Sequence, residues 1–244
     1  MGLTVNFAGG GYEDIVLYLT GILKHLNCKT LILDHTLDHI FYSCIPHLEG
    51  INPAENILDF GRAYYKMETL KKMSYLRTVD IGTADPGTVD GKISGTGTVN
   101  DVTIDNREET GFELVIRLYD YSTFPEPGAM SVIVSDEHRV HAEALEKFRL
   151  EMGNVLILKN FTGVIKKQYE NIAYRLGCEK VFALPFSEKD YRSFVYAEYH
   201  AKAGFSHISG ELEQVLLYLT GMILPEKSVK EIKKAYRAGK GGKK

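Results

Sequence analysis

Cysteine is scarce in this sequence, and no apolar stretch is long enough to cross a bilayer. Three cysteines occur among 244 residues, Cys28, Cys44 and Cys178, and none belongs to a CxxC pair or to a metal-ligand spacing. A disulfide framework and a zinc finger are therefore excluded, and reduced thiols are expected. The first fourteen residues have no basic region ahead of their apolar run, so they do not resemble a secretory signal. These absences predict a soluble protein of the cytoplasm.

Motifs of covalent and dinucleotide-dependent enzymes are also missing. No G-x-S-x-G elbow occurs, and Cys44 has no identifiable activating partner. Gly9, Gly10 and Gly11 follow the first apolar run but do not form G-x-G-x-x-G. Asp34 is nevertheless spaced for a ribose contact after a strand, a turn and a helix. A Rossmann-like ligand-binding enzyme therefore stays open as an alternative.

Apolar periodicity predicts a strand, a glycine turn and a helix at the start of the chain. Leu3–Phe7 has the pattern of a buried strand, and the pattern from about Glu13 to Leu26 is typical of a helix. Thr30–Leu33, which ends at Asp34, predicts a second strand. The first 35 residues would then form a βαβ unit with a parallel pair of strands.

Strand and helix patterns alternate along the rest of the chain. Residues 82–111 are dense in Gly, Thr and Asp and predict a long loop, whereas Glu137–Leu150 predicts a helix capped by Asp136. The alternation predicts one domain, residues 1–224, with a three-layer α/β fold of P-loop NTPase-like or Rossmann-like type, in which helices cover both faces of a mostly parallel central sheet. The other predicted strands are Leu76–Ile81, Glu113–Tyr119, Met130–Ser135, Asn154–Leu158 and Lys180–Leu184, and the other predicted helices are Tyr64–Met73, Val164–Leu176, Glu188–His200 and Glu211–Leu224.

The turn after the first strand has the form of a phosphate loop without its chemistry. It reads Ala-Gly-Gly-Gly-Tyr-Glu-Asp, and a strand that leads through glycines to a helix N-terminus gathers free N–H groups and the positive end of the helix dipole. In register with a P-loop, Tyr12 replaces the phosphate lysine, and Glu13 and Asp14 replace the hydroxyl residues. A carboxylate about 4 Å from a phosphate costs about 4 kcal/mol at an effective dielectric of about 20, or roughly a thousandfold in affinity. Alternatively, Glu13 and Asp14 only stabilise the first helical turn.

Several segments, in order and over roughly residues 1–224, resemble the ParA/MinD family of P-loop ATPases. LTVNFAGGGYEDIVLYLTGIL is similar to that family's first strand, deviant Walker A loop and first helix, and KTLILDHT to its second strand, which ends in an acid. FELVIRLYDYSTFPEPGAMSVIVSDEHRVHAEALEKF resembles the segment from the Walker B strand through the next strand and helix. NVLILKNF and KVFALPFSEKDYRSFVYA resemble the late strand, often ending in Asn, and the proline turn beside the base pocket.

The departures from that family fall on its nucleotide-binding positions. The early signature lysine aligns with Phe7, the phosphate lysine with Tyr12 and the magnesium-binding residue with Glu13. The Walker B acid falls at Leu118 or, if the strand is longer, at Asp120. The resemblance therefore implies the fold of the family and argues against efficient ATP hydrolysis.

The resemblance implies a vestigial nucleotide site. No catalytic residue and no metal ligand is assigned to it. Asp34 matches the acid that activates water in relatives, or it is a turn residue. The function implied is that of a pseudo-ATPase without a cofactor, a scaffold or positioning factor in a bacterial assembly of the pilus, secretion or partitioning type, as in TadZ-like relatives. Protein partners and a homodimer are expected, and no specific nucleic acid; an ATPase that uses ATP and magnesium through an altered loop is the alternative. The residues of the vestigial site are Gly9, Gly10, Gly11, Tyr12, Glu13, Asp14, Asp34 and Asp120.

The last part of the chain is basic. The formal net charge is −3, but residues 226–244 contain eight Lys or Arg and two Glu, which leaves an acidic body. Residues 225–244 are therefore a separate basic helix or tail, with Val229, Ile232 and Tyr236 along one side. Members of the MinD branch reach membranes through such a helix, but three apolar residues provide little insertion energy. Weak attachment to the inner face of the membrane and a solvated tail are the two alternatives.

Two groups of histidines and acids have compositions that suit a metal or acid–base site. Each lacks an evident further ligand, and each fits an ordinary polar loop or helix start, so no metal site is predicted. The groups are His35 with Asp38 and His39, and Asp136 with His138 and His141.

Overall fold

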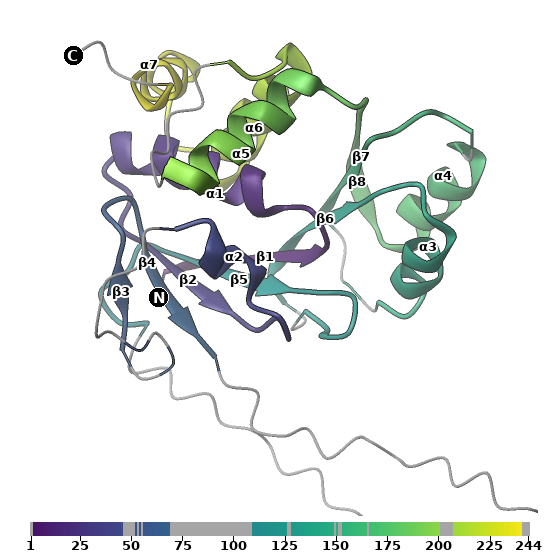
Figure 1. Ribbon diagram of the computed structural model, residues 1–244, viewed down its shortest axis with the longest axis horizontal. Coiled ribbons are helices and arrows are strands. Elements are labelled where there is room, and N and C mark those ends of the chain that lie inside the picture. The colour runs from purple at the N-terminus through teal and green to yellow at the C-terminus, as the bar shows by residue number, and fades with distance from the viewer. Residues whose placement is uncertain are drawn as a thin grey trace, which may run out of the picture.

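A sheet of eight strands runs through the part of the chain that the structure describes (Figure 1). This computed structural model describes residues 2–45, 52, 54, 56–68, 109–125, 128–148, 150, 153–164, 166–200 and 207–240. The strands are β1 (Leu3–Gly9), β2 (Thr30–Asp34), β3 (Leu58–Asp59), β4 (Tyr64–Met67), β5 (Leu114–Tyr119), β6 (Met130–Ser135), β7 (Asn154–Lys159) and β8 (Cys178–Leu184). The helices are α1 (Glu13–His25), α2 (Ile40–Ser43), α3 (Arg139–Leu145), α4 (Lys166–Arg175), α5 (Glu188–His200), α6 (Gly210–Ile223) and α7 (Val229–Gly239).

The strand order is β3-β4-β2-β5-β1-β6-β7-β8, and only the β3–β4 pair is antiparallel. The expected parallel pairing of the first two strands is wrong, because β5 lies between β1 and β2, with Val5 and Ile32 both opposite Ile116. A helical crossover such as α1 makes two strands parallel but does not fix how many positions it skips. The parallel strands end at one edge of the sheet, where the loops after β1, β2, β5, β6 and β7 meet.

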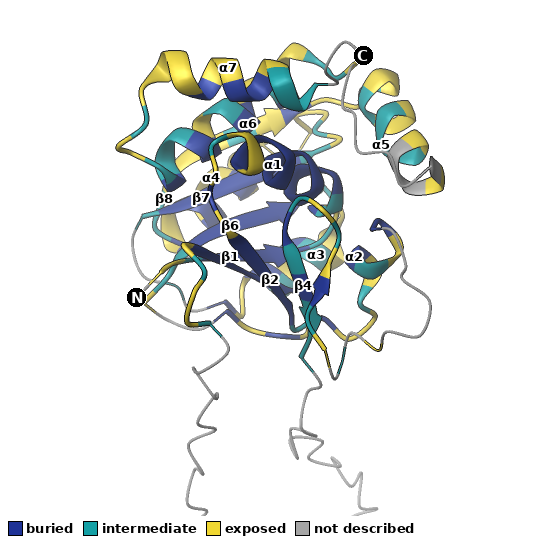
Figure 2. Cartoon of the chain, turned by 90° about the vertical axis from the view of Figure 1, so that its left-hand side faces the viewer, coloured by how far each residue is buried: buried dark blue, intermediate teal, exposed yellow. Residues whose placement is uncertain are grey.

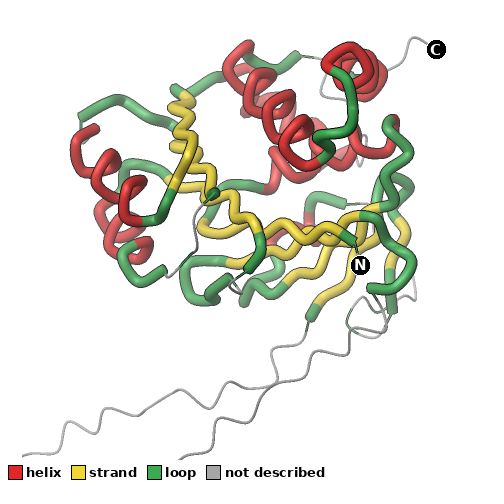
Figure 3. The backbone as a smooth tube through the Cα atoms, turned by 180° about the vertical axis from the view of Figure 1, so that it is seen from behind, coloured by secondary structure: helices red, strands yellow, loops and turns green. Residues whose placement is uncertain are grey.

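Helices cover both faces of the sheet, which confirms the predicted three-layer α/β architecture. Alternate residues of each strand point to opposite faces. On one face, Phe7 and Leu118 belong to the core formed with α1, α6 and α7. On the other, Ile133 and Leu156 belong to a second core with α3 and α4. The strands lie between the two groups of helices in Figure 3.

Three predicted elements differ from the structure or lie outside its described residues. The helix predicted at Tyr64–Met73 is wrong, because Tyr64–Met67 forms β4, where Tyr65 is fully buried opposite Ile32. Sheet pairing outweighs local propensity there. The strand predicted at Leu76–Ile81 and most of the 82–111 loop lie outside the described residues.

The helix predicted at Glu137–Leu150 is shorter than expected. It spans Arg139–Leu145 as α3, and its N-cap residue is His138, which makes no side-chain cap. The carboxylate of Asp136 instead accepts a hydrogen bond from the backbone N–H of His138, two residues further on. Asp136 is therefore a turn residue ahead of the helix.

The basic helix α7 packs against the domain through the apolar side that the sequence predicts. Ile232 and Tyr236 are buried, whereas Val229 is 68% exposed. A capping box between Ser228 and Glu231 begins the helix. Figure 2 shows the side of α7 that faces α1 as buried and its outer side as exposed. Attachment to a membrane remains a prediction, and it would depend on the outer lysines. Among the described residues, no helix has the length and hydropathy needed to cross a bilayer.

Candidate functional site

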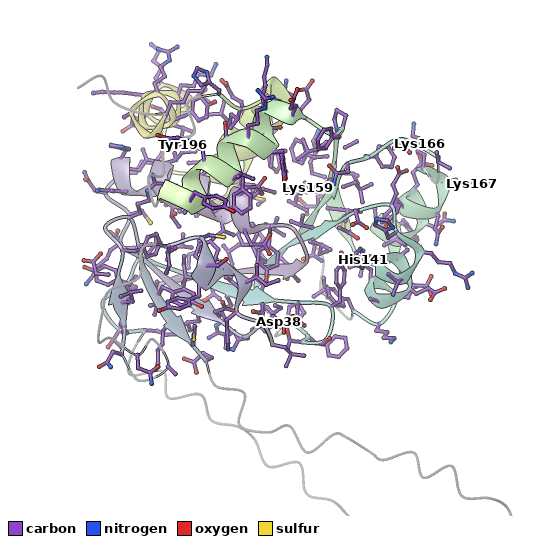
Figure 4. All side chains as sticks on the ribbon, viewed as in Figure 1. Asp38, His141, Lys159, Lys166, Lys167 and Tyr196 are labelled. Carbon is purple, nitrogen blue, oxygen red and sulfur yellow. The ribbon has the colours of Figure 1, made fainter. Side chains whose placement is uncertain are left out.

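A cavity of about 400 Å³ opens at the carboxyl edge of the sheet, beside the glycine turn. It lies between the N-terminus of α1 and the loops that follow β2, β5, β6 and β7. Figure 4 labels Lys159, His141 and Asp38 around the middle of this edge. The lining residues are Gly9, Gly10, Gly11, Tyr12, Glu13, Thr36, Asp38, Ile40, Phe41, Asp120, Tyr121, Ser135, Asp136, His141, Lys159 and Asn160. Six of the eight residues of the predicted vestigial site therefore meet in one place, and the other two, Asp14 and Asp34, lie outside the lining.

Close packing requires two of the loop glycines. Gly9 has φ +104°, and a Cβ atom there would lie 2.1 Å from the carbonyl oxygen of Val134. A Cβ on Gly10 would lie 3.0 Å from the ring of Tyr121. The N–H of Gly10 donates to the same Val134 carbonyl at 3.0 Å, so this amide is not available to a ligand. The two glycines thus allow the loop to pack closely against β6 and to line the cavity.

Two residues that the sequence analysis aligned with family lysines, Phe7 and Tyr12, are core aromatic side chains. Phe7 is fully buried and Tyr12 is 3% exposed, and their rings meet edge to face with centroids 6.3 Å apart. Burial raises the pKa of Tyr12 well above its ordinary value, and the charge of Asp34 raises it further. The Tyr12 phenol is therefore neutral and provides no positive charge for a phosphate.

Glu13 begins α1 and occupies the anion-binding end of the helix with its own side chain. The hydrogen bond from its own backbone N–H favours the charged carboxylate. Burial nevertheless raises the pKa of Glu13, and the charge of Asp14 adds to the shift, while Lys159 opposes it. An incoming phosphate would have to displace this carboxylate from the helix N-terminus.

Lys159 reaches the loop from the end of β7, and the sequence analysis missed it. Its ammonium donates to the carbonyl oxygen of Gly11 and to Oδ2 of Asp14, both at 2.8 Å. Asp14 is buried in the first turn of α1, where its Oδ1 accepts a hydrogen bond from the N–H of Ile15 at 2.7 Å, and its Oδ2 also holds a lysine 145 residues away. The only available signal was a lysine at the end of a predicted strand, which does not reveal its partner.

Asp34 lies behind the cavity rather than in its lining. Its side chain is completely buried, and Oδ1 accepts hydrogen bonds from the N–H and hydroxyl of Thr36 at 3.0 and 2.6 Å. Oδ2 accepts a hydrogen bond from the Tyr65 hydroxyl at 2.7 Å, and Nδ1 of His39 lies 3.4 Å from Oδ1. Asp34 therefore joins β2 to β4 and shapes the following turn.

Of the two candidates for the Walker B acid, Asp120 lies at the cavity and Leu118 lies in the core. Oδ1 of Asp120 accepts hydrogen bonds from the N–H groups of Ser122 and Thr123, at 2.6 and 2.9 Å. Its Oδ2 accepts a hydrogen bond from the N–H of Leu37 at 2.8 Å. Backbone donors thus fix the Asp120 side chain, and these hydrogen bonds connect the loop after β2 to the loop after β5.

The opposite wall contains an imidazole and an aromatic ring. Nδ1 of His141 lies 2.6 Å from Oδ1 of Asp136, and the His141 ring stacks on Tyr121 with centroids 4.4 Å apart. The Tyr121 hydroxyl donates a hydrogen bond to Oγ of Ser135 at 3.1 Å. His138 is outside the cavity lining, and in the described ranges no three His, Cys, Asp or Glu side chains are arranged to hold a metal ion.

The other histidine group is divided by the fold. Asp38 lines the cavity, whereas His35 stacks on Tyr119 with centroids 5.0 Å apart, and His39 lies against Asp34. Burial, together with the positive charge of Arg117, lowers the pKa of His35 to about 4. His35 is therefore a neutral packing residue at physiological pH.

Comparisons with known proteins show the fold alone. No family of protein sequences and no curated protein matches the chain. Among solved structures, a ParA family ATPase from Chlorobium tepidum TLS aligns over 98% of this chain and 99% of its own, with 9% identity and a TM-score of 0.45. The MinD cell division protein of Aquifex aeolicus aligns over 93% of this chain and 98% of its own, with 13% identity and a TM-score of 0.50. The similarity to MinD, together with the sheet and its helices, shows the α/β fold of ParA/MinD P-loop NTPases, as the resemblance predicted.

Proposed function

We propose that this protein is a degenerate, TadZ-like relative of the ParA/MinD ATPases that does not hydrolyse nucleotide and acts as a scaffold or positioning factor. The observation that carries the proposal is the burial of Tyr12, because a neutral core phenol replaces the cation that neutralises phosphates in a P-loop. The carboxylate of Glu13 adds a negative charge at the same helix end. Protein partners, a homodimer and weak contact of α7 with an anionic membrane belong to the same proposal, as does a cytoplasmic location.

Calorimetry with ATP, ADP and GTP, with and without magnesium, tests the nucleotide part of the proposal. We expect no binding heat at millimolar nucleotide and no phosphate release. A matched variant, Tyr12→Lys with Glu13→Thr, restores the two family residue types. It is the control that tests whether this fold binds nucleotide when those residues are present. Binding of ATP by the unaltered protein would overturn the proposal, especially if Asp120→Asn abolished phosphate release.

One observation favours an altered-loop ATPase as the second candidate. The ammonium of Lys159 lies 2.8 Å from the carbonyl of Gly11 and so brings a cation to the loop from another strand. In this candidate, Lys159 would leave Asp14 and bind phosphate. The variant Lys159→Met distinguishes the two candidates. It would abolish nucleotide binding by an active ATPase, whereas it would not change nucleotide binding by a pseudo-ATPase.

The scaffold role predicts an assembly state that does not respond to nucleotide. Light scattering over a wide protein concentration range, with and without ATP and magnesium, would measure this state. We expect a dimer under both conditions. A monomer at every concentration would remove the homodimer from the proposal, and dimerisation only with ATP would favour the second candidate.

A further inference from the structure

The charge of the cavity lining is strongly negative. Among the described residues, four carboxylates line it, and the one lysine of this lining, Lys159, already forms an ion pair with Asp14 behind the wall. The other basic group among these lining residues is the His141 imidazole, which lies against Asp136. The four carboxylates are those of Glu13, Asp38, Asp120 and Asp136.

In the described part of the structure, backbone N–H groups hold two of these carboxylates in place. Backbone N–H groups hold Asp120, and Asp136 accepts the N–H of His138 at 2.9 Å. Within the described ranges, neither Glu13 nor Asp38 has an ion-pair partner of opposite charge within 4 Å. Several carboxylates around one cavity, with few cations among them, create a field that attracts positive charge.

Tyr12 supplies a second observation, independent of the acids. The residue is 97% buried and lines the cavity, yet no group in the described part of the chain forms a hydrogen bond with its hydroxyl. Because the hydroxyl has no hydrogen-bond partner among the described residues and Tyr12 lines the cavity, this group is available to a ligand. The charges that act on it are those of Asp34, Glu13 and Asp120. The hydroxyl can accept a hydrogen bond from a cationic N–H donor at this position.

The walls and the size of the cavity suit an organic cation. Phe41 and Tyr121 line it together with Tyr12, and aromatic rings attract ammonium and guanidinium groups. Its volume of about 400 Å³ falls in the range of small-molecule sites. No three potential metal ligands of the described ranges converge there, so a bare metal ion is not favoured.

We propose that this cavity binds an ammonium or guanidinium group, with the carboxylates of Glu13, Asp38 and Asp120 and the hydroxyl of Tyr12 as its partners. The group could belong to a free amine or to a basic side chain of a protein, and the chemistry of recognition is the same in both cases. This inference concerns the ligand of the cavity and does not depend on the scaffold role.

Calorimetric titration of the full chain with spermidine, agmatine and a short lysine- and arginine-containing peptide tests the proposal. Saturable binding of spermidine or agmatine alone would identify a free amine, and binding of the peptide alone would identify a basic side chain. Asp38→Asn should weaken binding about tenfold, because it removes one carboxylate from the lining. Glu170→Gln makes the same charge change on α4, where Glu170 pairs with Lys166 outside the cavity, and should leave affinity unchanged.

A second variant keeps the test sharp if Asp38 is not in contact with the ligand. Tyr12→Phe removes one oxygen atom and should weaken binding several-fold without altering thermal unfolding. Absence of saturable binding for all three probes at millimolar concentration would overturn the proposal, as would equal affinities for the unaltered chain, Asp38→Asn and Tyr12→Phe. ATP binding, measured separately, would overturn the proposed function instead, so the two failures are distinguishable.

Discussion

The ammonium of Lys159 lies 2.8 Å from Oδ2 of Asp14 and joins the end of β7 to the first turn of α1. Asp14 is buried, while the Lys159 side chain is 25% exposed. The contact makes Asp14, which follows the glycine turn, a structural partner of Lys159. It also explains why an acidic residue is tolerated at a buried position beside Glu13.

Loss of Lys159 should destabilise the protein because it leaves a buried carboxylate without its cation. We expect Lys159→Met to lower the free energy of unfolding by about 1 to 3 kcal/mol, measured by urea denaturation. Lys166→Met is the matched control, since the Lys166 side chain is 72% exposed and its ammonium lies 3.9 Å from Glu170. That change should stay within about 0.5 kcal/mol. Equal effects of the two variants would show that the Asp14 contact is not structural.

The glycine turn should tolerate no side chain at Gly9. Gly9→Ala would place Cβ 2.1 Å from the Val134 carbonyl at φ +104°, so we expect a loss of more than about 3 kcal/mol or no folded protein. Gly61→Ala is the control, because Gly61 also has a positive φ, +80°, but nothing lies within 4 Å of the added Cβ. It should cost only about 1 to 2 kcal/mol. Thermal unfolding of both variants separates the cost of the steric clash from the cost of placing alanine at a positive φ.

Acid should destabilise the fold partly through His35. Burial lowers its pKa from 6.5 in the unfolded chain to about 4 in the folded protein. Below pH 6.5 the unfolded chain binds a proton that the folded protein does not, so the contribution of His35 is present above pH 6.5 and is lost as the pH falls to about 4. The loss should reach at most about 3 kcal/mol.

Urea denaturation of the unaltered protein and of His35→Phe at pH 7, 5 and 4 would isolate this contribution. Phenylalanine keeps a ring that can stack on Tyr119 and cannot be protonated. The variant should therefore lose less stability between pH 7 and 4 than the unaltered protein. Parallel losses would show that other groups account for the acid sensitivity.

The C-terminal helix should contribute to the stability of the domain. Ile232 is 5% exposed and lies close to α6. A Cβ atom added at Gly221 of α6 would be 3.6 Å from Cδ1 of Ile232. Ile232→Ala should cost about 2 to 4 kcal/mol through lost apolar burial and a cavity. Val229→Ala, at a residue of the same helix that is 68% exposed, should cost less than about 0.5 kcal/mol. An equally small effect of both changes would mark α7 as a tail that separates easily from the domain.

Much of the fold was predictable from the sequence because local signals agree with it. Short runs of apolar residues predict β1, β2, β5, β6, β7 and β8. Helical patterns between these runs predict α1, α4, α5 and α6. The short strand β4 was missed because Tyr64–Met67 has no strong pattern of its own. Pairing with β2 and burial of Tyr65 decide its conformation.

The candidate site was predictable only where its residues follow one another in the chain. The sequence determined that the loop at Gly9–Gly11 is followed by Tyr12, Glu13 and Asp14, and that it therefore lacks a local cation. Only the tertiary structure decided that Lys159 reaches Asp14. It also decided that Asp38 and Asp136 complete the acidic lining, while Asp34 remains behind it. Local patterns encode the direction and burial of an element, whereas strand order and side-chain reach across the carboxyl edge depend on how the whole sheet assembles.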